Sequence, residues 1–187
     1  MKKITGENAL VLMGLKHCGK SSIGEIIAAD LEIGFTDLDR LIMHTAQAEG
    51  YSSIRELYRT VGLKNFQEYE VNALRKLQDS KDEAAFILAL GGGTVDNPAA
   101  MKIAGTFGRL IYLDVDEHVL LRRILKGGTP PFLQGTESPE ELFHSLYTRR
   151  DHLYRKYADA TVRLAPRPLE ENCKLLYSEL KERSYVR

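Results

Sequence analysis

Tryptophan is absent from this chain of 187 residues, cysteine is scarce, and neither sign of charge is in excess. Lys and Arg together number 26, as do Asp and Glu, so the formal net charge is zero. General nucleic-acid and membrane-surface binders need a basic excess, so this balance argues against both kinds of partner. Two distant cysteines, Cys18 and Cys173, make no disulfide framework, which favours a reducing, cytoplasmic setting.

Long hydrophobic runs are also missing. No apolar run approaches the roughly 20 residues of a membrane span, and residues 1–7 lack the apolar core of a signal peptide. The length suits one α/β domain, on a prior of roughly 100–200 residues per domain. We therefore expect a single soluble domain over residues 1–187 that acts as a monomer.

What the sequence does contain is a strand, a glycine loop and a helix near its start. The apolar run 9–13 reads as a buried parallel strand, and the segment 14–21 fits the phosphate-loop pattern Gly, four residues, Gly-Lys-Ser. Such a loop turns backbone N–H groups and a helix N-terminus toward phosphate oxygens, which predicts binding of ATP. The residues expected to bind ATP here are Gly14, Leu15, Lys16, His17, Cys18, Gly19, Lys20, Ser21 and Ser22. Lys20 would reach the β- and γ-phosphates, and the Ser21 hydroxyl would bind Mg²⁺.

Two carboxylates, Asp37 and Asp39, follow the expected second strand at 33–36. Ligands of open parallel sheets bind at the carboxyl ends of the strands. If the strand continues through both residues, the period of two places both carboxylates on one face. The alternative is a solvated turn in which Asp39 caps the next helix.

Further along the chain, apolar runs alternate with amphipathic stretches. Expected strands lie at 84–90, 109–114 and 160–164; expected helices lie at 40–50, 53–60, 64–76, 98 onward, 117–125, 139–157 and 169–182. The expected N-caps are Ser52 or Ser53, Asn97, Asp116 and Ser138, and Gly62 should break the helical run. Five strands alternating with helices predict a three-layer α/β fold, with a parallel sheet covered on both faces.

Two glycine-rich segments stand out. Gly91, Gly92 and Gly93 follow the third strand, where they allow close approach of a ligand, although a flexible corner is the simpler alternative. The segment at about 126–136 is a long loop between helices, which favours a lid over bound nucleotide, with an ordinary surface loop as the alternative.

The order of these motifs resembles the shikimate kinase family, a branch of the small P-loop kinases, over nearly the whole chain. The resemblance implies ATP-dependent phosphorylation of shikimate to shikimate 3-phosphate, a step in aromatic amino acid biosynthesis. It implies catalytic roles for Lys20 and Asp39, with Ser21 and Asp37 at Mg²⁺, and acceptor-binding helices at about 40–78. The implied acceptor-binding residues are Asp39, Gly91, Gly92, Gly93, Arg150 and the position of Gln67. Arg123 and Arg167 match adenine-binding positions, and Glu70 matches an acid that supports a substrate-binding arginine.

The sequence departs from the family pattern at two arginines. Gln67 stands where the family carries an arginine for the substrate carboxylate, and Pro130 stands where it carries the lid arginine. Neither residue supplies a charged donor. Lys64, Lys126, or the added positive charge of Lys16 and His17 are candidates to compensate. The departures leave open a different small hydroxylated acid or polyol as acceptor, and also a non-catalytic nucleotide-binding regulator.

Overall fold

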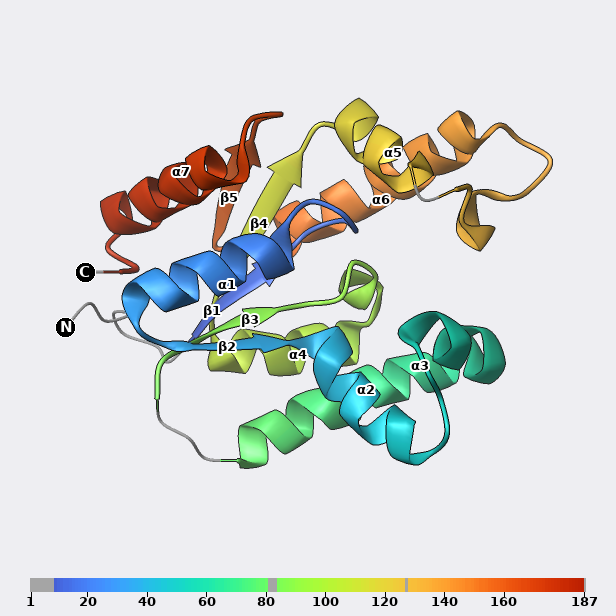
Figure 1. Cartoon of the computed structure of the whole chain (residues 1–187), viewed down its shortest axis with the longest axis horizontal. Helices are drawn as coiled ribbons and strands as arrows, with labels where there is room; N and C mark the ends of the chain where they lie inside the picture. Colours follow the sequence, from blue (N-terminus) through green and yellow to red (C-terminus); the bar gives the residue numbers. More distant parts are fainter. Residues whose placement is uncertain (1–8, 81–83, 127, 187) are drawn as a thin grey trace.

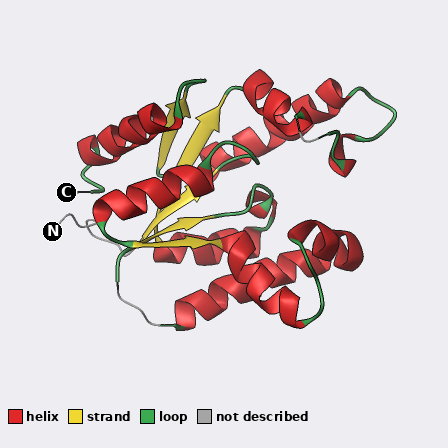
Figure 2. Cartoon of the chain, viewed as in Figure 1, coloured by secondary structure: helices red, strands yellow, loops and turns green. Residues whose placement is uncertain are grey.

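Five parallel strands form the centre of the protein. The computed structural model describes residues 9–80, 84–126 and 128–186; residues 1–7, where no signal peptide is expected, and Gly127 of the expected lid lie outside them. The strands are β1 (Ala9–Met13), β2 (Gly34–Asp37), β3 (Phe86–Ala89), β4 (Gly108–Val115) and β5 (Ala160–Leu164). Their order is β2-β3-β1-β4-β5, and every pairing is parallel (Figure 2). The predicted sheet is therefore confirmed.

Helices cover both faces of this sheet. They are α1 (Lys20–Leu31), α2 (Leu38–Ala48), α3 (Ile54–Asp79), α4 (Pro98–Phe107), α5 (Glu117–Leu125), α6 (Pro139–Tyr157) and α7 (Leu169–Glu182), with short 3-10 turns η1 (Thr94–Asp96) and η2 (Pro131–Leu133). Helices α1 and α7 lie together on one face, and α4 and α6 lie on the other (Figure 1). Helices α2 and α3 pack against each other, and α3 also packs against α4. None of the described helices is long and apolar enough to cross a membrane.

The helix boundaries follow from local capping. The Ser53 hydroxyl accepts from the backbone N–H of Glu56, Asn97 caps α4, Asp116 caps α5, and Ser138 forms a capping box that opens α6. Gly62 has φ 76° and interrupts α3, so the two predicted helices form one kinked run. These predictions of caps and of the break are confirmed.

The buried apolar strands fix the sheet edge at which the predicted motifs lie close together. All five residues of β1 are buried, as expected for a strand between two helical layers. Leu12 pairs with Ala89 of β3 and with Ile111 of β4, which fixes the register of the central strands. Because the strands are parallel, the loops after β1, β2 and β3 leave the sheet at one edge. The phosphate loop, Asp37 and the three glycines are therefore neighbours.

Candidate active site

The loop between β1 and α1 is wound tightly around one buried lysine. Lys20 Nζ donates to the carbonyl oxygens of Gly14 (2.8 Å) and Leu15 (3.1 Å). His17 has φ 65° and Gly19 has φ 103°, so the loop turns through two left-handed positions before the helix begins. The backbone thus holds an ammonium group inside a loop at a helix N-terminus, the arrangement expected for phosphate binding.

Asp37 joins this loop to the next strand. The Ser21 hydroxyl donates to Asp37 Oδ2 at 2.6 Å, and Asp37 Oδ1 accepts from the backbone N–H groups of Asp39 (3.0 Å) and Arg40 (3.3 Å). Asp37 is the last residue of β2 and the N-cap of α2, and Asp39 lies in the first helical turn. The prediction that both carboxylates share a strand face was wrong because the strand ends at Asp37. The alternative cap was also misplaced, since Asp37 caps the helix.

Asp39 is a desolvated carboxylate close to the phosphate loop. Burial is the largest cause that raises its pKa, and the negative charge of Asp37 adds to the effect, while Lys20 and Lys16 oppose it. A methyl group at Gly91 would lie 3.0 Å from Asp39 Oδ1, so the glycine loop passes directly beside this carboxylate. A carboxylate with a raised pKa accepts a proton from a hydroxyl group more readily than an exposed one.

Gly92 is packed against the phosphate loop itself. A Cβ atom at Gly92 would lie 2.7 Å from the backbone nitrogen of Lys16, closer than packed atoms allow. On its other side the Gly92 carbonyl accepts from the hydroxyl of buried Tyr154 at 2.8 Å. Tyr154 stacks on Tyr112 of β4, with ring centroids 4.8 Å apart. Helix α6 and the sheet therefore fix the position of the glycine loop.

Glu70 is a buried acid of α3, to which only the family resemblance gave a role. It is 3% exposed, and its carboxylate accepts from Thr94 Oγ1 (2.6 Å) and Asn97 Nδ2 (2.9 Å). Burial raises its pKa, although the two hydrogen bonds act in the opposite direction. Among the described residues, Glu70 bonds to this threonine and this asparagine, whereas the family resemblance implied an arginine. Glu70 thus ties α3 to the segment after the glycine loop.

Arg150 is held by a neighbouring carboxylate that the sequence did not single out. Its Nε donates to Asp96 Oδ2 at 2.9 Å, and Arg149 donates to both oxygens of Asp96. The Gln67 amide donates to the Asp96 backbone carbonyl at 3.1 Å. Burial alone would raise the pKa of Asp96, but the bonds and charges of the two arginines outweigh it and lower that pKa. The predicted residues Gln67 and Arg150 therefore meet at Asp96.

The two arginines expected near adenine lie apart from this cluster. Arg123 of α5 donates to the His17 carbonyl at 2.9 Å, which places it against the phosphate loop. Arg167 lies in the loop between β5 and α7, where it is exposed. Burial, followed by the charges of Lys16, Lys20 and Arg123, lowers the pKa of His17. This shift disfavours the charged imidazolium of His17 and so weakens the expectation that His17 adds positive charge.

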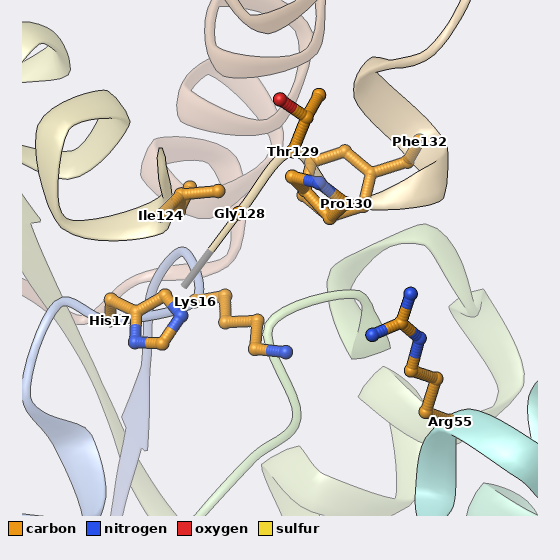
Figure 3. Close-up of a pocket in the computed structure, with 8 residues that line it drawn as sticks. All are labelled: Lys16, His17, Arg55, Ile124, Gly128, Thr129, Pro130 and Phe132. Carbon is orange, nitrogen blue, oxygen red and sulfur yellow. The ribbon is translucent and has the colours of Figure 1, made fainter. Parts of the chain in front are cut away.

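A cavity of about 300 Å³ lies between the phosphate loop and the expected lid (Figure 3). Lys16 and His17 line it from the loop, Thr129, Pro130 and Phe132 line it from the lid segment, and Arg55 lines it from α3. Lys64 and Lys126, the predicted substitutes for the lost arginines, are not among the described lining residues. Sequence reasoning missed Arg55, since one charged residue on an exposed helical turn carries no distinguishing signal.

A buried lysine in a glycine loop, a serine paired with an aspartate and a desolvated carboxylate beside them define a P-loop kinase for small molecules. The family model for shikimate kinase matches residues 16–181. The chain therefore belongs to the shikimate kinase family, as the motif order indicated, and the expected class of enzyme is confirmed.

Individual relatives agree with this assignment. A shikimate kinase of Bartonella henselae is 37% identical over 148 residues, covering 79% of this chain and 67% of that protein. One from Chromohalobacter salexigens is 35% identical over 162 residues, covering 84% of this chain and 83% of that protein. Among solved structures, shikimate kinase of Aquifex aeolicus has a TM-score of 0.72 at 26% identity, covering 94% of this chain and 98% of that one. The Acinetobacter baumannii shikimate kinase in complex with shikimate has a TM-score of 0.81 at 24% identity, covers 95% of each chain, and shows the shared fold.

Proposed function

We propose that this chain transfers the γ-phosphoryl group of ATP to the 3-hydroxyl of shikimate, producing shikimate 3-phosphate and ADP. The observation that carries the proposal is the position of Asp39. Its desolvated carboxylate lies beside Gly91 and two residues after Asp37, which is hydrogen-bonded to Ser21 of the phosphate loop. A proton acceptor is thus placed next to a phosphate-binding loop, as transfer to a hydroxyl requires.

The phosphate loop and its neighbours carry groups suited to the nucleotide and to Mg²⁺. The backbone N–H groups of 14–22 and Lys20 would hold the phosphates, with Arg123 and Arg167 toward the adenine end. The Ser21 hydroxyl and the Asp37 carboxylate, 2.6 Å apart, are the oxygen ligands that Mg²⁺ prefers. Mg²⁺ usually keeps several waters and takes one or two protein oxygens plus phosphates, so this pair fits it. When bound, the ion neutralises phosphate charge.

The acceptor side uses the segment after β3 and helix α6. Gly91, Gly92 and Gly93 would face the acceptor, because Gly91 lies beside Asp39 and a methyl group at Gly93 would lie 3.3 Å from Arg150 Nη2. Arg150 would bind the shikimate carboxylate with the N–H groups that Asp96 leaves free. Gln67 offers an amide where the family carries a guanidinium, which predicts weaker binding of the carboxylate.

The reaction is a direct displacement. The acceptor oxygen forms a bond to the γ-phosphorus, the bond from that phosphorus to the β,γ-bridging oxygen breaks, and ADP leaves with the electron pair. The hydroxyl proton passes to Asp39. Lys20 and the loop N–H groups stabilise the charge on the transferred group. The lid segment, at about 126–136, would exclude water from the site. One described chain carries all of these groups, which supports action as a monomer, and the free thiols of Cys18 and Cys173 support a cytoplasmic setting.

A panel of acceptors tests the proposal. We would measure ADP release with ATP, Mg²⁺ and, in turn, shikimate, related hydroxylated acids and neutral polyols. We expect shikimate to give the highest kcat/KM. Higher turnover with another compound would reject shikimate as the substrate, and ATP binding without turnover on any acceptor would indicate a nucleotide-binding regulator.

The pairing of Arg150 with Asp96 favours one second candidate. With one arginine neutralised and Gln67 in place of another, the pocket has less positive charge for a carboxylate. A different hydroxylated acid or polyol is therefore the alternative acceptor that the same panel examines.

A further inference from the structure

The lid side of the cavity lacks the charged donor that phosphoryl transfer ordinarily uses. Pro130 lines the cavity and offers no N–H group. His17 lines it too, but burial and the neighbouring cations lower its pKa, which disfavours the charged imidazolium. Lys16 remains as one cation on the phosphate-loop side. A transferring phosphoryl group spreads negative charge over three oxygens, and no described lining residue of the lid segment offers a positive charge to the oxygens on that side.

Arg55 is a second cation that faces the same space. It lies one residue inside α3, which begins at Ile54, and its guanidinium and the Lys16 ammonium both point toward the region beneath Pro130 (Figure 3). Arg55 makes no hydrogen bond or ion pair with any residue that the structure describes. By contrast, Arg123, Arg149 and Arg150 each donate to a protein oxygen. The five donors of Arg55 are therefore available to an anion.

The position of Arg55 is not explained by the stability of its helix. A cation in the first helical turn opposes the macrodipole, at a cost of about 0.3–1 kcal/mol. Ser53 already caps this helix, and Glu56 supplies the acid of the first turn. The Arg55 side chain instead lines the cavity.

We propose that Arg55 contacts the transferred phosphoryl group from α3 and supplies the charge that Pro130 cannot supply from the lid. This inference rests on the proposed function. In the displacement described above, Arg55 donates to the γ-phosphate oxygens and takes no part in bond formation or proton transfer. Guanidinium is suited to this role because its planar donors match phosphate oxygens in pairs.

Substitution at Arg55 tests the proposal. We expect Arg55→Ala to lower kcat by roughly 100-fold or more, since an arginine at a phosphoryl-transfer transition state is worth about 10³–10⁵ and Lys16 remains. Arg55→Lys should recover part of that loss. Affinity for ADP, which lacks the γ-phosphate, should change less than about twofold, whereas affinity for ADP with aluminium fluoride should fall in parallel with kcat. The matched control is Arg59→Ala, one turn later on α3, which should leave all of these values unchanged.

A second variant moves the charge back to the lid. Pro130→Arg should raise kcat of the Arg55→Ala enzyme at least about tenfold, and should raise that of the wild type much less, because the two arginines would serve one group. Retention of kcat in Arg55→Ala would overturn the proposal. A rise only in the acceptor KM would overturn it too, because Arg55 would then bind the acceptor carboxylate.

The proposed function and this inference fail in different ways. Loss of the proposed function appears as a wild-type enzyme without shikimate-dependent turnover. In that case Arg55 is tested by the preference for a non-hydrolysable ATP analogue over ADP, which Arg55→Ala should reduce about tenfold. An unchanged preference would overturn the inference.

Discussion

The two halves of the site are built in different ways. In the phosphate-binding half, a strand, a loop and a helix that are consecutive in the chain place Lys20 and Ser21, and the main contacts run within 14–21 or to Asp37. In the acceptor and lid half, residues 24 to 54 positions apart meet through side chains, as Asp96 meets Arg150 and Glu70 meets Thr94.

That difference explains where this chain departs from its family. A phosphate loop depends on backbone geometry, so few residues can change without losing it. The acceptor half depends on which charges face one another, and several arrangements can serve. The family resemblance places Gln67 and Pro130 where arginines are expected, while in this structure Asp96 binds Arg150 and Arg55 faces the cavity.

The largest expected effect comes from Asp39, which stands between the halves. Asp39→Asn should lower kcat about 10²–10⁴-fold, the usual contribution of a positioned proton acceptor, while ATP affinity changes little. In the wild type, kcat should rise with pH through an apparent pKa above the ordinary value of 3.8. An active Asp39→Asn enzyme would exclude Asp39 as the proton acceptor. Exposed Asp30→Asn in α1 is the control.

The same substitution has an expected effect on stability. Burial raises the folded-state pKa of Asp39 above its unfolded value. The protonated side chain therefore contributes stability below the unfolded pKa, and this contribution is lost as pH rises through the folded-state pKa. Asp39→Asn should therefore melt at a higher temperature than the wild type at pH 7. The difference should shrink near pH 4, and thermal melts at both pH values measure it.

Gly92 tests whether the two halves must stay in contact. In Gly92→Ala the new methyl group would meet the backbone of Lys16, so the two loops must move apart. We expect kcat/KM to fall roughly 10- to 100-fold, as for a displacement of about 1 Å. Gly105→Ala in α4 is the control, because its Cβ would make an ordinary contact 3.9 Å from Leu110 Cδ1, and we expect a gain of up to about 1 kcal/mol in unfolding free energy. Equal activity of the two variants would show that the contact is dispensable.

Gln67→Arg sharpens the comparison by restoring a charge to the acceptor half. Asp96 already binds Arg149 and Arg150, so a third guanidinium is free for the acceptor carboxylate. We expect the KM for shikimate to fall about tenfold, the low end for a charged hydrogen bond of roughly 1.5–3 kcal/mol. The KM for ATP should not change. Gln78→Arg, which lies further along α3, is the control, and an unchanged acceptor KM would count against carboxylate binding at this position.

The smallest expected effect concerns Asp96 and acid. Its folded-state pKa lies below the unfolded value, so its contribution to stability is present above the unfolded pKa and is lost as pH falls through the folded-state pKa. Asp96→Asn should lower the unfolding free energy by about 1.5 kcal/mol at pH 7. Urea denaturation should show a much smaller difference near pH 3. A difference that is independent of pH would rule out the ion pairs as its cause.

Sequence reasoning succeeded wherever structure depends on near neighbours. Ser53, Asn97 and Ser138 cap the predicted helices because a cap bonds to groups two or three residues away. It failed at Glu70 and Arg55, whose surroundings come from distant segments. Sequence reasoning also could not predict the exact end of β2, because a strand that stops at Asp37 and one that continues to Asp39 share the same apolar pattern.

A single-turnover transfer of labelled phosphate would test the central claim most directly. Enzyme in excess over ATP labelled at the γ-phosphate would be mixed with Mg²⁺ and shikimate, and the products separated. We expect the label in shikimate 3-phosphate, in equal amount to ADP, which would show that Pro130 in the lid and Gln67 at the acceptor do not prevent transfer. Label released as inorganic phosphate, or retained in ATP, would contradict the claim.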